Sequence, residues 1–217
     1  GNSESGISGN KQTAGFGERD FWIVRIDGAG NKLWERTFGG SLTDQAASIK
    51  QTTDGGFIVG GHSMSGISGN KETASTPEGD YWVIKLDANG NKVWERAYGG
   101  GGSESMQSLQ QTSDGGYILG GYSNSLPVPP GNKTTPGYGV GDIWAVKIDD
   151  QGNIQWQQTF GGGYVDGARA VRQTSDGGYI FGGMTMIHSV GGNKTSPIYG
   201  SSDFWVVKTD SAGNKQW

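Results

Sequence analysis

Apolar residues occur along the chain in short runs, and each run ends at a turn rich in glycine and aspartate. In one stretch, residues 103–112 have modest apolar character and end at Ser113-Asp114-Gly115-Gly116. This tetrapeptide is a strong hairpin signal, because glycine tolerates a positive φ angle. A second strand is predicted at 117–122. The pattern therefore predicts short antiparallel strands joined by tight turns.

The same stretch continues with a long loop at 123–141, rich in Pro, Gly, Asn and Ser. A third strand at 143–148 is apolar on both faces except for Lys147, and such a strand needs cover on both sides. A turn at 149–153 then leads into a fourth strand that carries Trp156 and Phe160. We expect four strands in this unit.

The unit repeats along the chain with a period of about 60 residues. Four Asp-x-Trp triplets begin the predicted third strands, and their tryptophans are 60, 62 and 61 residues apart: Trp22, Trp82, Trp144 and Trp205. A second tryptophan keeps the same rhythm, at Trp34, Trp94, Trp156 and Trp217. Self-similarity at a fixed period indicates a repeat architecture. We expect most of these indoles to pack between neighbouring repeats.

Four short antiparallel strands per repeat are typical of a β-propeller blade, whereas the coils of a parallel β-helix are usually much shorter. The predicted fold is therefore an all-β propeller of four-stranded blades, with about three and a half blades present. Residues 1–38 form a partial blade, followed by blades at 39–98, 99–160 and 161–217, the last nearly complete. A propeller needs its last blade closed. We therefore expect the chain to be an excerpt of a longer repeat chain or ring.

Composition narrows the function classes. The formal net charge is −4, and no run of basic residues exceeds two, so nucleic acid is not expected as a partner. The apolar runs are far too short to cross a bilayer, so no membrane insertion is expected. The chain has no cysteine, which excludes disulfides and thiolate metal sites.

The repeats resemble those of a known class of proteins. The string from Gly55 to Gly100 contains Gly-Gly-Phe-Ile-Val-Gly-Gly-His-Ser, then Ile-Ser-Gly-Asn-Lys, then Asp-Tyr-Trp-Val-Ile-Lys-Leu-Asp-Ala-Asn-Gly-Asn-Lys-Val-Trp-Glu-Arg. It is similar to the delta-60-type propeller repeats of secreted and surface bacterial proteins, over nearly the whole chain. Residues 87–94 also resemble the docking motif of quinoprotein-like propellers, in which a turn and a tryptophan lock neighbouring blades. The resemblance implies a propeller fold and an extracellular or cell-surface setting, but no particular activity.

The long loops are predicted to share one face of the propeller, where binding residues usually lie. Each contains Gly-Asn-Lys followed closely by threonine, and these side chains suit sugar hydroxyls or carboxylates. The opposing interpretation is an ordered loop, in which asparagine makes a turn and threonine bonds local backbone. Two tyrosines in the longer loops are candidate aromatic anchors. The candidate ligand-binding residues are Asn70, Lys71, Thr73, Asn132, Lys133, Thr134, Tyr138, Asn193, Lys194, Thr195 and Tyr199.

Repeated carboxylates are the remaining candidates. Asp44, Glu104 and Asp166 occupy equivalent positions before each predicted first strand, where they could bind calcium or cap a backbone N–H. Apart from calcium, no cofactor is expected. Aspartates at 20, 80, 142 and 203 precede every third strand and are expected to fix the loop exit by side-chain to backbone bonds. Those at 27, 87, 149 and 210 are expected to shape hairpins, because they lack the acidic run of an EF-hand.

An enzyme is not expected. The sequence has two histidines, His62 and His188, and no nucleophile elbow, zinc motif, phosphate loop or dinucleotide fingerprint. We expect an exported module that mediates binding or adhesion to a glycan, a surface protein or other copies of the same chain. Two alternatives stay open: a purely structural repeat of a fibre or stalk, and a fragment of a secreted hydrolase whose paired carboxylates come from different blades.

Overall fold

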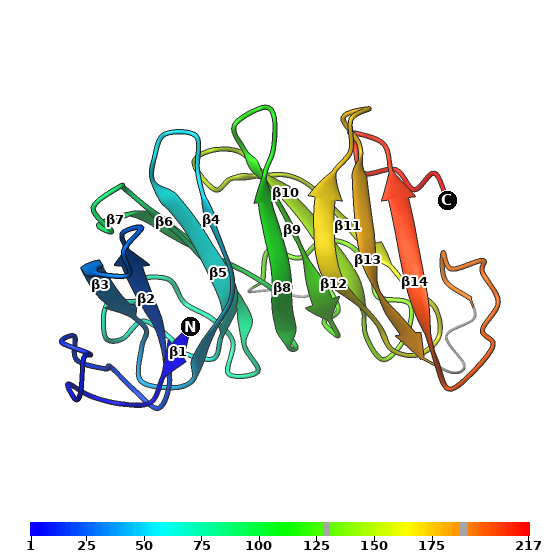
Figure 1. The fold of residues 1–217 in the computed structure, drawn as a ribbon. Coiled ribbons are helices and arrows are strands. Elements are labelled where there is room, and N and C mark those ends of the chain that lie inside the picture. Colours follow the sequence, from blue (N-terminus) through cyan, green and yellow to red (C-terminus); the bar gives the residue numbers. More distant parts are fainter. Residues whose placement is uncertain (128–130, 187–190) are drawn as a thin grey trace.

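The computed structural model describes residues 1–127, 131–186 and 191–217. Within these residues the chain is all-β and forms four antiparallel sheets, which lie side by side in chain order (Figure 1). No helix that is long and apolar enough to span a membrane occurs in this described part.

The first and last sheets have three strands each. The first has the order β1 (Asn2–Ser3), β2 (Asp20–Ile26) and β3 (Lys32–Phe38). The last has the order β12 (Asp166–Gln173), β13 (Tyr179–Met186) and β14 (Ser202–Thr209). Beyond β14 an isolated bridge joins Thr209 to Lys215, where the sequence predicts the start of a fourth strand.

The two central sheets have four strands each, in sequence order. One consists of β4 (Asp44–Gln51), β5 (Phe57–Ser63), β6 (Asp80–Leu86) and β7 (Lys92–Tyr98). The other consists of β8 (Glu104–Gln111), β9 (Tyr117–Ser123), β10 (Asp142–Ile148) and β11 (Ile154–Phe160). The four strands predicted for this second unit are confirmed within two residues at each end.

Local chemistry explains the tight turns. In the β8–β9 hairpin, Gly115 has a φ angle of 86°, and Asp114 accepts hydrogen bonds from the Thr112 hydroxyl and the Gly116 N–H. The buried ammonium of Lys147 lies 2.9 Å from the Asp114 carboxylate. The one polar residue of the apolar third strand therefore pairs with the hairpin turn. The same arrangement recurs in the neighbouring sheets, through Lys85 with Asp54 and Lys208 with Asp176.

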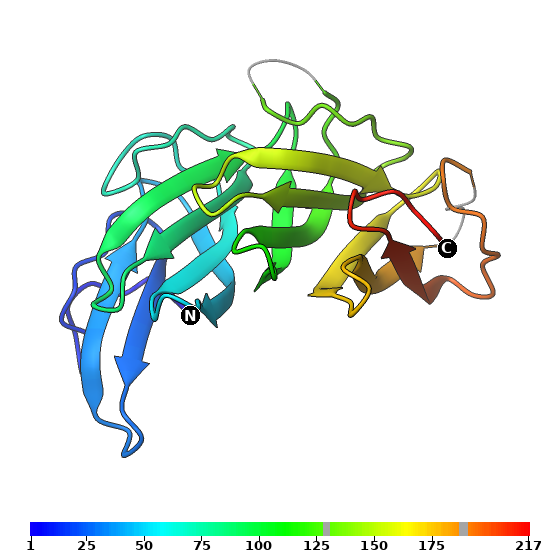
Figure 2. The same cartoon turned by 90° about the horizontal axis from the view of Figure 1, so that it is seen from above.

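Seen from above, the sheets follow an arc (Figure 2). The strands β3, β7 and β11 lie toward its convex side, and β8 and β12 lie toward its concave side. In Figure 1 the tight hairpins β4–β5, β8–β9 and β12–β13 point to one end of the sheets, here called the hairpin end. The long loops lie at the opposite end, here called the loop end.

Aromatic side chains hold neighbouring sheets together. Across two of the junctions, the ring of Phe21 lies 4.9 Å from that of Trp82, and the ring of Tyr81 lies 4.9 Å from that of Trp144. All four side chains are buried. The Phe21–Trp82 pair belongs to one hydrophobic cluster and the Tyr81–Trp144 pair to another. On the convex side, Trp94 donates its indole N–H to the carbonyl of Asp150 in the next sheet, 3.0 Å away. Packing between repeats is thus confirmed for Trp82, Trp144 and Trp94, whereas Trp217 is 61% exposed.

Candidate functional site: a groove at the loop end

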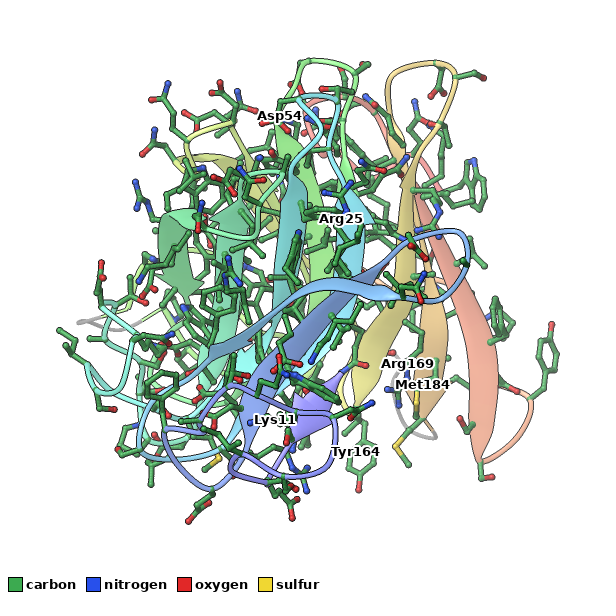
Figure 3. All side chains as sticks on the ribbon, turned by 60° about the vertical axis from the view of Figure 1, so that its left-hand side comes forward. Lys11, Arg25, Asp54, Tyr164, Arg169 and Met184 are labelled. Atoms are coloured by element: carbon green, nitrogen blue, oxygen red, sulfur yellow. The ribbon has the colours of Figure 1, made fainter. Side chains whose placement is uncertain are left out.

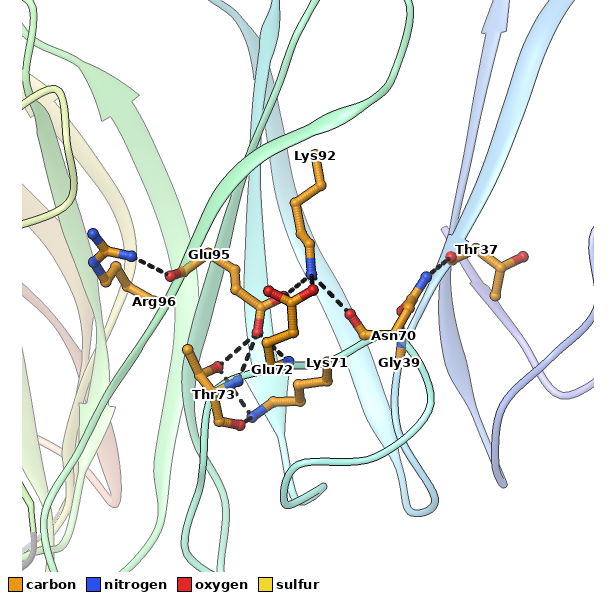
Figure 4. Close-up of polar contacts among 9 residues, drawn as sticks. All are labelled: Thr37, Gly39, Asn70, Lys71, Glu72, Thr73, Lys92, Glu95 and Arg96. Atoms are coloured by element: carbon orange, nitrogen blue, oxygen red, sulfur yellow. Dashed lines mark hydrogen bonds and ion pairs between the residues drawn. The ribbon is translucent and has the colours of Figure 1, made fainter.

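The predicted loop asparagines connect each loop to the preceding sheet. Asn70 accepts a hydrogen bond from the Gly39 N–H at 3.0 Å and donates one to the Thr37 carbonyl at 2.9 Å (Figure 4). The same pair of bonds is made by Asn132 to Gly99 and Ala97, and by Asn193 to Gly161 and Thr159. Each side-chain amide is therefore engaged within the chain.

The loop lysines are buried. Lys71 is 1% exposed, and its ammonium donates to the Thr73 carbonyl and to the Ser75 hydroxyl at 3.0 Å. Burial lowers the pKa of Lys71, while the charges of Glu95, Asp44 and Asp80 act in the opposite direction. Lys133 and Lys194 are buried in the same way and donate to carbonyls of their own loops. The structure uses these ammonium groups to order the loops.

The remaining loop candidates differ in exposure. Thr73 donates to the buried carboxylate of Glu95, whereas Thr134 and Thr195 are exposed. Tyr138 is 39% exposed and rests on the next loop at Gly192. A β-carbon built on Gly192 would lie 2.7 Å from the Cβ of Tyr138. Tyr199 is 87% exposed. The structure does not gather these candidates around one cavity.

The carboxylates before each first strand accept backbone hydrogen bonds. Asp44, Glu104 and Asp166 are fully buried, and each accepts from the N–H four residues earlier at 2.8 to 2.9 Å. Glu104 also accepts from the hydroxyls of Ser123 and Ser125. Within the described residues, no three acidic, histidine or cysteine side chains gather as a metal site. This geometry matches the capping interpretation.

Each of these carboxylates faces the aspartate that fixes a loop exit. Asp80 accepts from the Thr76 N–H at 3.1 Å, as predicted, and a β-carbon on Gly99 would contact both Asp80 and Glu104. Burial, with a contribution from Glu104, raises the pKa of Asp80 to about 6. Asp142 has the same relation to Asp166, and its pKa is likewise raised to about 6. Acidic pairs therefore lie buried at the sheet junctions.

A groove opens at the loop end on the concave side, between β8, β9 and β12. It has a volume of about 330 Å³ and is lined by Ser105, Gln107, Tyr122, Val165, Gly167, Ala168, Arg169 and Met184. Among these described residues, Arg169 alone carries a charge. Figure 3 shows Arg169 beside Met184, with Tyr164 nearby at the same end and Asp54 at the far end.

Two β-bulges aim side chains into this groove. The register between β8 and β9 shifts at Gln107, and that between β12 and β13 shifts at Arg169, so each is an extra residue in its strand. The guanidinium of Arg169 donates to the Gln107 side-chain oxygen at 3.4 Å, and Gln107 donates to the Ser105 hydroxyl at 2.9 Å. The groove therefore presents the exposed guanidinium of Arg169 and the partly exposed amide of Gln107, and the ring of Tyr122 also lines it.

Sequence reasoning did not identify this groove, although the repeat contains a signal for it. The bulge position is occupied by Ala47, Gln107 and Arg169 in successive repeats, and a position on the second strand by His62, Tyr122 and Met184. The side chain at each of these two positions changes from repeat to repeat, whereas the glycine pair before the second-strand position and the acidic residue before the bulge recur. His62 contacts the Glu104 carbonyl at 2.7 Å, and His188 lies outside the described residues.

Comparisons with known proteins give little functional information. No protein-family profile matches the chain. Over 152 residues, 66% of this chain, it is 28% identical to the regulatory protein FlaEY of Caulobacter vibrioides. The match spans only 15% of that protein's length. A solved structure of a protein of unknown function from Bacteroides caccae aligns with 94% of this chain and 78% of its own, at 12% identity and a TM-score of 0.33.

Proposed function

We propose that the chain is a non-enzymatic binding module that takes its ligand in the groove at the loop end. The observation that carries this proposal is that non-repeated side chains meet there on an otherwise repeated scaffold. Residues present in every repeat serve the fold, whereas a binding site needs side chains of its own. Rigid strands hold Gln107 and Arg169, which favours a preformed site.

The chemistry of the groove favours a glycan that bears a carboxylate. Arg169 is exposed, and its side-chain partners among the described residues, Gln107 and the Met184 sulfur, are uncharged. A guanidinium in this setting suits bidentate binding of a carboxylate. The ring of Tyr122 offers an apolar face to a sugar, and Gln107 and Ser105 offer polar groups to its hydroxyls. The exposed loop residues Tyr138, Thr134 and Thr195 extend the proposed contact surface.

A glycan array with matched variants tests this proposal. The wild-type chain should bind acidic glycans, those containing uronic or sialic acid, above neutral ones. Arg169→Ala should weaken that binding at least tenfold in calorimetry, because it removes the one charged side chain among the described residues that line the groove. Arg172→Ala is the control, because Arg172 is exposed on the same strand but does not line the groove.

The outcomes are distinct. Equal losses in the two arginine variants would indicate a general charge effect and contradict a groove site. Array silence together with capture of a specific protein through Arg169 would replace the glycan by a protein ligand. Binding that Arg169→Ala leaves intact would move the site elsewhere on the loop end.

We also propose that the sheets are blades of a propeller in an extracellular or cell-surface protein. The arc of four sheets, with β8 and β12 toward its concave side, supports the propeller, and the resemblance to delta-60-type repeats supports the setting. An experimental structure with the sheets arranged radially about one axis would bear out the fold. Surface labelling of the source cells would test the setting, since an internal protein would stay unlabelled.

A further inference from the structure

The three junctions between sheets share one set of contacts. On the convex side, the rings of Trp34, Trp94 and Trp156 each cover a turn glycine of the next sheet, at Gly90, Gly152 and Gly213. Their indole N–H groups donate to backbone carbonyls of the same turns, at Ala88, Asp150 and Ser211. A tryptophan that covers a glycine turn is therefore a fixed part of each junction.

Two further contacts recur deeper in the junctions and at the loop end. The residue after each loop-exit aspartate packs on the tryptophan of the next sheet, as Phe21 does on Trp82 and Tyr81 does on Trp144. At the loop end, Phe16 lies over Gly69, as Tyr138 lies over Gly192. Each junction thus joins aromatic rings that project from one sheet to glycines and a third-strand tryptophan on the next sheet. These two sides are here called the projecting half and the receiving half of the contact set.

The outer face of the last sheet presents the projecting half of this contact set. Tyr199, Phe204 and Trp217 occupy the positions equivalent to Tyr138, Tyr81 and Trp156. They are 87%, 82% and 61% exposed, whereas Tyr81 is fully buried. All three line one surface groove, together with Trp205 and Val206. Within the described residues nothing covers this face.

The outer face of the first sheet presents the receiving half. Gly9 and Gly30 are equivalent to Gly69 and Gly90, yet nothing lies within 4 Å of a β-carbon built on either. Val24 and Ile26 are 38% and 59% exposed, whereas the equivalent Ile84 and Leu86 are fully buried. Trp22 is partly exposed, whereas the equivalent Trp82 is fully buried. The first sheet thus presents the turn glycines and the third-strand positions of a junction, without a counterpart of the first strands β4, β8 and β12.

We propose that these two faces bind each other between two copies of the chain, in a head-to-tail contact that repeats the internal junctions. Tyr199 of one copy covers Gly9 of the other, Phe204 packs on Trp22, and Trp217 covers the turn at Gly30. The occupant is a second copy because the projecting half and the receiving half of the recurring aromatic contacts lie on the same chain. Such a contact is heterologous, so it forms rings where the rotation closes and filaments where it does not. It involves neither Arg169 nor the groove and stands apart from the proposed function.

Sedimentation velocity of the 217-residue chain tests the proposal. Protein concentrations from about 1 to 200 µM cover the range in which a weak interface would form. The wild-type chain should show mass that rises with concentration. Phe204→Asp, on the projecting face, and Ile26→Asp, on the receiving face, should each stay monomeric. Ile67→Asp is the control, because Ile67 is 70% exposed outside both faces. Unchanged urea midpoints show that the variants fold.

Mixing the variants tests the head-to-tail geometry. Phe204→Asp retains an intact receiving face and Ile26→Asp an intact projecting face, so their mixture should form dimers and nothing larger. Self-association of Ile26→Asp alone would indicate a symmetric contact between projecting faces and overturn the proposal. A wild-type chain that stays monomeric at 200 µM, or one whose assembly survives both substitutions, overturns it as well.

Discussion

The hairpin end and the loop end of the same sheets relate to the repeat in different ways. At the hairpin end the three later sheets share one arrangement, in which a buried lysine pairs with the turn aspartate at 2.8 to 2.9 Å. The turns between third and fourth strands are equally uniform. In one of them Asp87 accepts from the N–H groups of Asn89 and Asn91, and aspartates 27, 149 and 210 do the same. These turn aspartates and lysines therefore shape the fold.

The loop end has a uniform interior and a varied surface. Asparagine, lysine and carboxylate side chains repeat beneath the loops and bond to backbone. Above them, the bulge position changes from Ala47 to Gln107 to Arg169. Repetition therefore marks the scaffold, and departure from repetition marks the proposed binding site. Substitutions at the two ends should therefore differ in size and in kind.

The largest effect is expected at the buried interior of the loop end. Glu104→Ala should lower the free energy of unfolding by about 3 kcal/mol, because it leaves the Gly100 N–H and two serine hydroxyls without their acceptor in a site closed to water. Urea-induced unfolding at pH 7 measures this loss.

The matched substitution at the hairpin end is Asp114→Ala. The Asp114 side chain is 52% exposed, so solvent weakens its pairing with Lys147, and we expect a loss of about 1 kcal/mol. Equal losses of unfolding free energy for Glu104→Ala and Asp114→Ala would contradict the expected energetic difference between the two ends.

A pH dependence is expected next, and it originates at the loop end. The pKa values of Asp80 and Asp142 are about 6 in the folded chain, against 3.8 for an ordinary aspartate. The folded state therefore holds these protons more tightly, and stability present in full below pH 4 is lost as the pH rises through 6. Each group should contribute a loss of about 2 kcal/mol between pH 4 and 7.

Asp142→Asn should remove one of these contributions and flatten the dependence. Urea midpoints at pH 4, 5, 6 and 7 compare the variant with the wild type. Asp54 at the hairpin end does not interfere, because Lys85 and Thr52 lower its pKa to about 2, outside this window. Parallel curves for variant and wild type would contradict the raised pKa of Asp142.

A smaller difference is expected between two asparagines. Asn132→Ala should cost about 1 kcal/mol, because it breaks the two bonds that hold its loop to Gly99 and Ala97. Asn153→Ala at the hairpin end should cost only a few tenths, because Asp149 keeps its backbone donors. Thermal unfolding of the two variants ranks them, and a larger loss for Asn153→Ala would reverse the comparison.

The sequence alone predicts the hairpin end well, because its signals are local. Asp114 lies within two residues of the turn that it shapes, and the 60-residue period repeats the signal. The tryptophan contacts between repeats also follow from periodicity. The roles of Asp80 and Asp142 at the loop exits were predicted for the same reason, since each bonds the N–H four residues earlier.

The loop end is harder to predict, because its interactions span long sequence separations. Asn70 bonds Gly39, which lies 31 residues earlier, so nothing nearby shows that the amide is engaged. The groove depends on bulges at Gln107 and Arg169, and a shift of one residue turns a strand side chain to the other face. Periodicity alone could not show where Arg169 points.

The smallest effect on stability is expected at the groove itself. Arg169 is exposed, and its hydrogen bond to Gln107 is long, at 3.4 Å. Arg169→Ala should therefore change the free energy of unfolding by less than about 0.5 kcal/mol. The same variant should lose the proposed glycan binding. Asn132→Ala should instead lose stability and still bind at urea concentrations below its unfolding midpoint. Urea unfolding and calorimetry on both variants separate the two roles. A large loss of stability in Arg169→Ala would show that the varied position also serves the scaffold, and departure from the repeat would then no longer distinguish site from fold.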